Sequence, residues 1–351
     1  MRSCGIVALG VHLPGTVVGL DDLYENGDGP PPRGPLLRPP DRRRHVGAEV
    51  RASEMIAAAA APLFERLGGT PRIDAVLCNV LLPDIPITGA GAEVCSLLDL
   101  SPQTVLDVHN GGCGSFPFML DLAARLLEGE GGMALVCNVQ NTAGRVFSQP
   151  TVRLRSHAVA AGDGCGVALL DLEAGSRVLA TAVAHQPDSA ADMGLEVPDG
   201  RLYWEAGEGE VDIHFAREKA ERIIRRGNEA VPAAVRAACE RAGVAVEELD
   251  ALVTNQPNRL FMRNWREELG IPAERHLDTF DELGNLYGAA APVTLARAAA
   301  TGRLRDGDLV AVAGFAHAGD FAAAAVIRWD GETAAAKSDP GRGEAWEAVA
   351  A

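Results

Sequence analysis

The stretch Val108-His109-Asn110-Gly111-Gly112-Cys113-Gly114-Ser115-Phe116 decides how the whole chain is interpreted. An apolar run over 104–108 precedes it and predicts a strand, and an apolar-periodic segment over 115–128 follows it and predicts a helix. Small residues on both sides leave space around the Cys113 sulfur. Because the N-terminal end of a helix favours negative charge, we expect a lowered thiol pKa and a thiolate that attacks acyl groups.

Composition excludes several classes of protein. A chain of 351 residues is long enough for two domains or one large duplicated domain. Its hydrophobic content of 47% allows a sizeable core. A net charge of −16 and an aromatic content of 5% argue against nucleic acid or an anionic membrane as the main partner. No apolar run is long enough to span a bilayer.

The cysteines and histidines predict neither disulfides nor a metal site. The seven cysteines are odd in number and contain no CxxC pair, which is typical of a reduced, cytoplasmic protein. The histidines at 157, 185, 214 and 276 show no metal-ligand spacing, so no metal is expected.

Predicted strands and helices alternate along the chain, which indicates a layered α/β fold. Strands are expected at 75–80, 104–108, 134–139, 166–171, 251–254, 309–313 and 322–329. Helices are expected at 52–67, 89–98, 115–128, 260–269 and 289–301, and over 211–242 with a break at Pro232.

Weak similarity between the two halves predicts an internal duplication. The segment AVLCN at Ala75 resembles ALVTN at Ala251, 176 residues later. In the same order, ALVCN at Ala134 resembles LVAVA at Leu309, 175 residues later. We interpret this ordered similarity as one βα unit present twice.

Four motifs, spread over nearly the whole chain, resemble those of a known family. They are the cysteine segment 107–116, the turn Gly162-Asp163-Gly164, the run Asn255-Gln256-Pro257-Asn258, and Gly284-Asn285, in which Asn285 follows Asn255 by 30 residues. In this order and spacing they resemble the thiolase fold, and within it the ketoacyl-ACP synthase III group and its acyltransferase relatives. The resemblance implies a layered αβαβα sandwich of two duplicated halves. Residues 1–173 would carry the nucleophile, and residues 174–351 the two asparagines and a glycine-containing turn.

The catalytic pattern departs from that of the group, which uses Cys, His and Asn. By resemblance, Cys113 and Asn285 occupy two of these positions, whereas Asn255 stands where the group has its histidine. An amide donates hydrogen bonds but carries no proton near neutral pH, which disfavours decarboxylative condensation and leaves self-acylation of Cys113 intact. The alternative for both asparagines is a purely structural role in turns.

A second departure lies in the turn Phe315-Ala316-His317-Ala318-Gly319-Asp320-Phe321. The resemblance implies that the backbone N–H groups of Cys113 and Gly319 form the oxyanion hole. His317 stands where the group has no histidine. We hypothesise that His317 is a general base for an incoming hydroxyl or amine, with a structural histidine as the alternative.

Substrate contacts are predicted at two further sets of positions. By family position Ile87 and Phe147 would line an acyl tunnel, with core packing as the alternative. Basic residues are candidates for holding the phosphates of coenzyme A or an acidic carrier protein, with a solvated face as the alternative. They are Arg42, Arg43, Arg222, Arg225 and Arg259.

Together these features predict an acyltransferase without a bound cofactor. An acyl-CoA or a phosphopantetheinyl carrier protein would acylate Cys113, and a small molecule of specialised, polyketide-type metabolism would accept the acyl group on oxygen or nitrogen. One alternative is decarboxylative Claisen condensation, and another is a non-catalytic scaffold subunit. The resemblance also implies a homodimer.

Overall fold

The computed structural model describes residues 4–24, 38–127, 132–216 and 219–338. Its main sheet contains two blocks of five strands. The blocks have the orders β5-β4-β6-β7-β1 and β12-β11-β13-β14-β8. The first block comprises β1 (Gly5–His12), β4 (Ile73–Val80), β5 (Thr104–Asp107), β6 (Met133–Gln140) and β7 (Gly164–Asp171). The second comprises β8 (Ser176–His185), β11 (Ala251–Thr254), β12 (His276–Leu277), β13 (Leu309–Ala316) and β14 (Phe321–Arg328).

The two blocks have the same strand directions. In each, three parallel strands are followed by two antiparallel ones. A short antiparallel pairing between β1 and the start of β8 joins the blocks, and β15 (Ala334–Ser338) adds to β1. This arrangement confirms the predicted duplicated α/β fold. The exact division after residue 173 stays a prediction, and it falls between β7 and β8.

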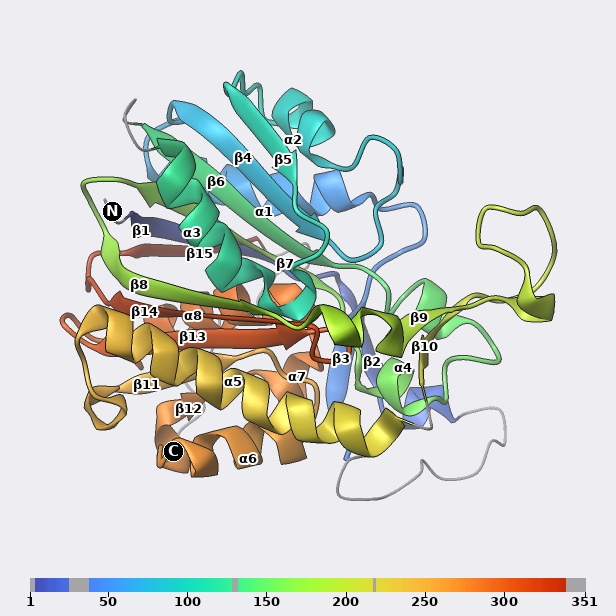
Figure 1. Cartoon of the computed structure of the whole chain (residues 1–351). Coiled ribbons are helices and arrows are strands. Elements are labelled where there is room, and N and C mark those ends of the chain that lie inside the picture. Colours follow the sequence, from blue (N-terminus) through green and yellow to red (C-terminus); the bar gives the residue numbers. More distant parts are fainter. Residues whose placement is uncertain (1–3, 25–37, 128–131, 217–218, 339–351) are drawn as a thin grey trace.

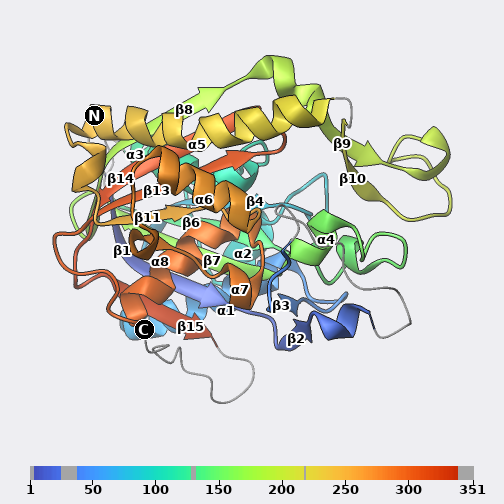
Figure 2. The same cartoon turned by 90° about the horizontal axis from the view of Figure 1, so that it is seen from below.

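Helices complete the layers on either side of these blocks. Helices α3 and α8 lie between the blocks, since each contacts strands of both. Helix α1 covers the outer face of the first block, with α2 beside it, and α5 covers that of the second, with α6 packed on it (Figures 1 and 2). Their bounds are α1 Ala52–Arg66, α2 Gly91–Leu97, α3 Ser115–Leu127, α5 Ala220–Ala242, α6 Arg259–Glu268 and α8 Ala290–Ala300.

Three hydrophobic cores fill the spaces between these layers. The central core surrounds α3 and α8 and includes Phe116 and Met119. A second core lies under α1, and a third lies between α5, α6 and the second block, where Trp265 is fully buried. The amphipathic patterns that predicted these helices therefore correspond to faces that are buried against the sheet.

The helix predicted over 211–242 is corrected in two ways. Residues Asp212–Phe215 form strand β10, and the helix α5 that follows runs through Pro232 without a break. Val231, Pro232 and Val235 are buried, and α5 packs on β8, β13 and β14. Tertiary packing along this face offsets the local cost of the proline.

Smaller elements surround one end of the sandwich. Strands β9 (Met193–Glu196) and β10 form a two-stranded arm that extends away from the body in Figure 1. Strands β2 (Thr16–Gly19) and β3 (Arg42–His45) form another pair. The short helices η3 (Val146–Ser148), α4 (Ser156–Ala160), α7 (Phe280–Leu283) and η9 (Tyr287–Ala289) lie in the connections. In the described part of the chain, no helix has the length and apolar character to cross a membrane.

Candidate active site

Cys113 lies in a tight turn between β5 and α3. Residues Gly112–Gly114 form a 3₁₀ turn, and α3 begins at the next residue. Gly112 has φ +44°, and a Cβ atom there would lie 2.8 Å from Ala316 Cβ and 3.2 Å from His317 Nε2. A residue without a side chain at this position therefore allows the turn that carries His317 to approach the nucleophile.

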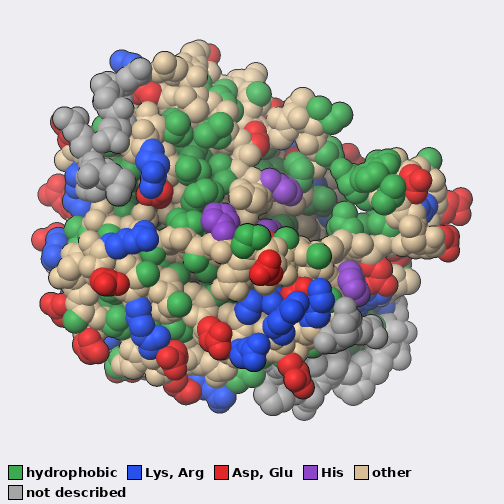
Figure 3. All heavy atoms as spheres, viewed as in Figure 1, with side chains coloured by type: hydrophobic (Ala, Val, Ile, Leu, Met, Phe, Trp, Pro, Cys, Tyr) green, Lys and Arg blue, Asp and Glu red, His purple; other side chains and the backbone are tan. Residues whose placement is uncertain are grey.

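A pocket of about 440 Å³ brings four predicted site residues together. Cys113, Asn255, Asn285 and His317 all line it, although they come from four separate segments of the chain. The surface is hollowed between the body and the β9–β10 arm, with histidine side chains nearby (Figure 3). Cys113 is also the only half-buried cysteine among the described residues, and the other six are buried.

The pKa expected for Cys113 is wrong in direction. Burial raises the pKa of the Cys113 thiol to about 12, although hydrogen bonds from the Asn255 side chain and from its own backbone act in the opposite direction. Desolvation of the sulfur between packed elements raises the thiol pKa by more than the N-terminal end of α3 can lower it. At neutral pH the sulfur is therefore a thiol, and a base must remove its proton before it can attack.

His317 has the geometry of such a base. Its Nδ1 lies 2.8 Å from Asp320 Oδ1, and its Nε2 lies against Gly112. A carboxylate accepts from an N–H, which leaves Nε2 of the neutral ring as the proton acceptor on the side of the nucleophile. His317 also has φ +52°, a conformation that costs free energy for a residue with a side chain.

The role predicted for Gly319 is corrected. Its backbone N–H donates to Ala316 O at 2.9 Å, and Gly319 does not line the pocket that contains Cys113. With φ +92° it closes the turn, and a Cβ atom there would meet the Arg226 side chain at 3.1 Å. The N–H is already engaged, so it is not free to hold an oxyanion.

Asn255 and Asn285 differ in how they face Cys113. The Asn255 side chain acts to lower the pKa of the Cys113 thiol. Its Nδ2 donates to Phe315 O and its Oδ1 accepts from the Phe315 N–H, both at 3.4 Å. Asn285 lines the pocket, but its Oδ1 accepts from the Tyr287 N–H at 3.0 Å. Gln256 points elsewhere and bonds Thr294 in the interior. Of the two asparagines, Asn255 is therefore the one whose side chain acts on the pKa of Cys113.

Three pocket features were not predicted from the sequence. Asp320 orients His317, as described above. Tyr287 lines the pocket, and burial raises the pKa of its hydroxyl. His157 lines the same pocket from α4. Only Asp320, three residues from His317, had a local signal in the sequence, because that spacing lets a carboxylate reach the ring within one turn.

The predicted tunnel residues do not line the pocket. Ile87 is 95% exposed on the surface of the described chain. Phe147 is buried in a small cluster with Ala143 and Val152, where its ring packs against His157 and Tyr287. For Phe147 the alternative of core packing holds, and for Ile87 a tunnel role within one chain is wrong.

The predicted basic residues fall into different environments. Arg43 is fully buried and donates to Val159 O, so it is not available to a donor, and that prediction is corrected. Arg259 is held by Asp278 and Asp281 at 2.8 and 2.5 Å.

The remaining three are more accessible. Arg42 lies 3.8 Å from Glu282, and Arg222 lies 3.0 Å from Asp192. Arg225 is exposed on α5, and Figure 3 shows Lys and Arg side chains gathered over this helix.

The Gly162-Asp163-Gly164 turn has a structural role, because its aspartate holds neighbouring loops together. The buried Asp163 carboxyl accepts from the backbone N–H groups of Val46, Ala143 and Gly144 at 2.9, 2.8 and 2.7 Å. Burial raises its pKa to about 7. The described residues also contain no cluster of His, Cys, Asp and Glu that could hold a metal ion.

Comparison with known proteins gives a consistent result. Residues 239–329 match the family described as 3-oxoacyl-[acyl-carrier-protein (ACP)] synthase III C terminal. The beta-ketoacyl-[acyl-carrier-protein] synthase III of Symbiobacterium thermophilum is 28% identical over 94% of this chain and 99% of its own length. That of Roseobacter denitrificans is 28% identical over 82% of this chain and 87% of its own. The crystal structure of the Thermus thermophilus synthase III superimposes with a TM-score of 0.78 at 24% identity, covering 93% of this chain and 99% of that one.

The layered architecture and these similarities define a thiolase-fold protein. Within that class, the chain is similar to beta-ketoacyl-[acyl-carrier-protein] synthase III proteins over most of its length, and the family match falls in its C-terminal half.

Proposed function

We propose that this protein is an acyltransferase that works through an acyl-Cys113 intermediate. The observation that carries the proposal is the contact of His317 Nε2 with the nucleophile turn, while Asp320 holds Nδ1 at 2.8 Å. A cysteine, a histidine and a carboxylate in this order are the parts needed to activate a nucleophile. The thiol pKa of about 12 makes the base a requirement.

The first half-reaction transfers an acyl group to the enzyme. His317 takes the proton from Cys113 Sγ, and the sulfur attacks the carbonyl carbon of an acyl-CoA or carrier-protein thioester. The bond from that carbon to the donor sulfur breaks, and His317 returns the proton to the leaving thiol. In this proposal Asn255 stabilises the attacking thiolate, in line with its lowering effect on the Cys113 pKa, and Asn285 contributes polar contacts to the reacting thioester from the pocket wall.

The second half-reaction passes the acyl group to an oxygen or nitrogen atom of a small acceptor, in specialised metabolism of the polyketide type. The supporting observation is Asn255 at the position where the family resemblance implies a histidine. A screen of acyl-CoA and acyl-carrier donors against wild type and His317→Ala tests the proposal by intact mass. We expect an acyl adduct on the wild type and much slower formation on the variant. Equal rates would contradict the role of His317.

A second candidate is decarboxylative condensation with a malonyl thioester. The names of the relatives favour it, and the Asn255 and Asn285 amides are donors that line the pocket where an enolate oxygen would develop. Release of CO₂ from a malonyl donor by the acylated enzyme, absent in Cys113→Ala, would support condensation. Transfer without CO₂ release would support the first proposal.

Charge at the start of α5 supports docking of an acidic donor there. Lys219, Arg222 and Arg226 share the single carboxylate of Asp192, which leaves net positive charge beside the pocket-lining residues of the same helix. Reversal of the exposed neighbour, Arg225→Glu, should raise KM for the donor with little effect on kcat. An unchanged KM would indicate a solvated face with no docking role.

The exposed edge of the sheet supports a homodimer. Strand β5 ends the first block, and its Val105 and Leu106 are 38% and 39% exposed. Ile87 and Leu97, at 95% and 49%, extend this apolar surface. Such an edge is normally covered, and a second copy pairing along β5 would cover it. Sedimentation velocity should give the mass of a dimer, which Val105→Lys should shift toward the monomer.

A further inference from the structure

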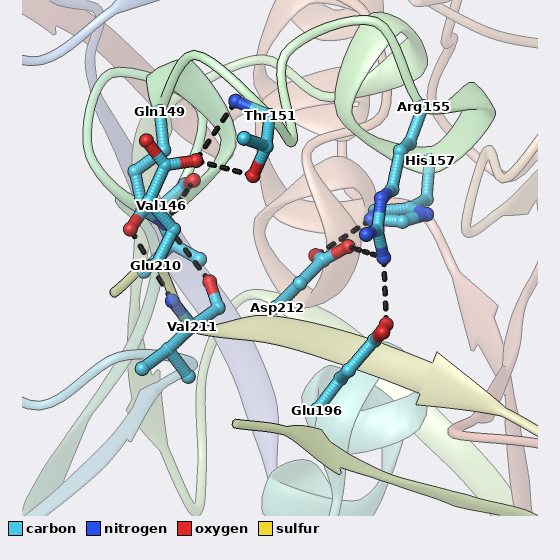
Figure 4. Close-up of polar contacts among 9 residues, drawn as sticks. All are labelled: Val146, Gln149, Thr151, Arg155, His157, Glu196, Glu210, Val211 and Asp212. Atoms are coloured by element: carbon cyan, nitrogen blue, oxygen red, sulfur yellow. Dashed lines mark hydrogen bonds and ion pairs between the residues drawn. The ribbon is translucent and has the colours of Figure 1, made fainter. Parts of the chain in front are cut away.

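A second histidine–carboxylate pair lies at the same pocket. His157, from α4, lines the pocket, and its Nε2 lies 2.8 Å from Asp212 Oδ1 of strand β10. Asp212 is buried, and Arg155 Nη1 lies 2.7 Å from its other oxygen. Figure 4 shows the Arg155 and His157 side chains both directed at this carboxylate, with Glu196 on the far side of Arg155.

These contacts determine which nitrogen of the neutral His157 ring carries the hydrogen. A carboxylate paired with an arginine is charged, so it accepts from His157 through Nε2–H. The neutral ring then carries its lone pair on Nδ1, for which the described residues offer no hydrogen-bond partner. The Phe147 ring packs edge-on against the imidazole at 5.2 Å between centroids and limits its rotation.

The pair is not needed to hold the β9–β10 arm in place. Gln149 bonds Val211, Thr151 bonds Glu210, and Arg155 bonds Glu196, so the arm has other attachments to the segment before α4 (Figure 4). Arg155 also balances the Asp212 charge without the histidine. Anchoring of the arm therefore does not depend on His157 alone, and it does not account for a pocket-lining histidine whose Nδ1 has no hydrogen-bond partner among the described residues.

Tyr287 relates the pair to the nucleophile. This tyrosine lines the same pocket as Cys113 and His157, and burial raises the pKa of its hydroxyl. The Phe147 ring that supports His157 also lies 6.4 Å from the Tyr287 ring. His157 therefore belongs to the wall around Cys113 and lies on a different element from His317.

We propose that His157, oriented by Asp212, is the general base for the acceptor, in place of His317, for which the sequence suggested this role and which here serves Cys113; the inference rests on the proposed acyl transfer. His157 Nδ1 takes the proton from the acceptor's hydroxyl or amine, and the acceptor atom bonds to the acyl carbon. The bond from that carbon to Cys113 Sγ breaks and its electron pair stays on sulfur. The abstracted proton returns to the sulfur through solvent, which restores the thiol and both neutral histidines.

The proposal restricts the chemical class of acceptor. A hydroxyl or amine must lose a proton as it attacks, and a histidine–carboxylate pair serves this step. A carbanion formed by loss of CO₂ receives its electron pair from the broken C–C bond and needs no such base. The pair therefore selects a protic acceptor.

The test is single-turnover deacylation of isolated acyl-Cys113 enzyme with two probes. Trifluoroethanol needs removal of a proton, whereas hydroxylamine attacks thioesters without a base. For His157→Gln, which should still form the adduct, we expect alcoholysis to fall about 100-fold or more, with hydroxylamine cleavage within about two-fold of wild type. The rise of the alcoholysis rate with pH that reflects the imidazole should disappear. His214→Gln is the matched control, because His214 is exposed on the same arm.

Asp212→Asn provides a second variant, since it keeps the side-chain shape and removes the charge that orients the ring. It should lower alcoholysis and alter its pH profile while leaving the hydroxylamine rate in place. Alcoholysis in wild type no faster than in His157→Gln overturns the proposal, as does an equal loss with both probes. Absence of any acyl adduct on wild type overturns the proposed function as well, so the two failures are distinguishable.

Discussion

Asp320→Asn isolates the contribution of the carboxylate to activation of Cys113. The substitution keeps the side-chain shape but replaces a charged acceptor, 2.8 Å from His317 Nδ1, with a neutral one. A hydrogen bond to a charged group contributes roughly 1.5–3 kcal/mol, against about 1 kcal/mol for a neutral one. The difference is therefore roughly 0.5–2 kcal/mol. The His317 and Asp320 side chains are 29% and 22% exposed, so solvent screening places the difference at the lower end of that range, about 0.5–1 kcal/mol.

This free energy predicts that acylation of Cys113 slows by roughly 2- to 5-fold. The assay is rapid quench with an acyl-CoA donor followed by intact mass, with the observed rate measured across pH.

The matched control is Asp188→Asn, the same chemical change on an exposed carboxylate near the β8 end. It should acylate at the wild-type rate. An Asp320→Asn enzyme that acylates at the wild-type rate would refute the reasoning, because the pair would then have no part in removing the thiol proton.

Three further predictions concern the turn, a helix cap and a buried ion-pair cluster. Gly112→Ala puts a side chain at φ +44° and 3.2 Å from His317 Nε2. The free energy of unfolding, measured by chemical denaturation, should fall by roughly 1–2 kcal/mol, and acylation of Cys113 should be largely lost. Acylation at the wild-type rate would count against the contact between Gly112 and His317. Asn258→Ala removes the acceptor of the Phe261 N–H at the start of α6 and should cost about 1 kcal/mol of stability in the same assay, with acylation retained. The Lys219 ammonium, with the neighbouring arginines, holds the pKa of Asp192 well below its usual range, so the stabilisation is complete above about pH 4 and is lost as pH falls further. Asp192→Asn should therefore flatten the acid limb of the stability profile measured by urea unfolding, and an unchanged limb would contradict the assignment.

The alternating pattern predicted most of the layered fold, for clear physical reasons. Fully buried strands such as β4 and β13 appear as continuous apolar runs, and amphipathic helices such as α1 and α3 appear as periodic ones. The arm was missed because β9 and β10 are short and partly exposed, so neither carries a strong pattern. The break at Pro232 was predicted from local chemistry, which the buried face of α5 overrides.

Site residues that belong to a sequence motif could be predicted. Properties that depend on tertiary packing could not. Cys113, Asn255 and Asn285 were found from motif order, and they meet in one pocket. The pKa of Cys113 was wrong because burial of the sulfur depends on elements far apart in sequence. His157 and Asp212 are 55 residues apart, on a short helix and an arm, and no spacing in the sequence brings them together.

The central claim, that Cys113 carries the acyl group, is tested most directly by peptide mapping after reaction with an acyl donor. Wild type should gain the mass of one acyl group, located on the peptide that contains Cys113, and Cys113→Ala should gain none. The six buried cysteines should remain unmodified in both proteins. An adduct on any other residue, or none on wild type with any donor, would contradict the account.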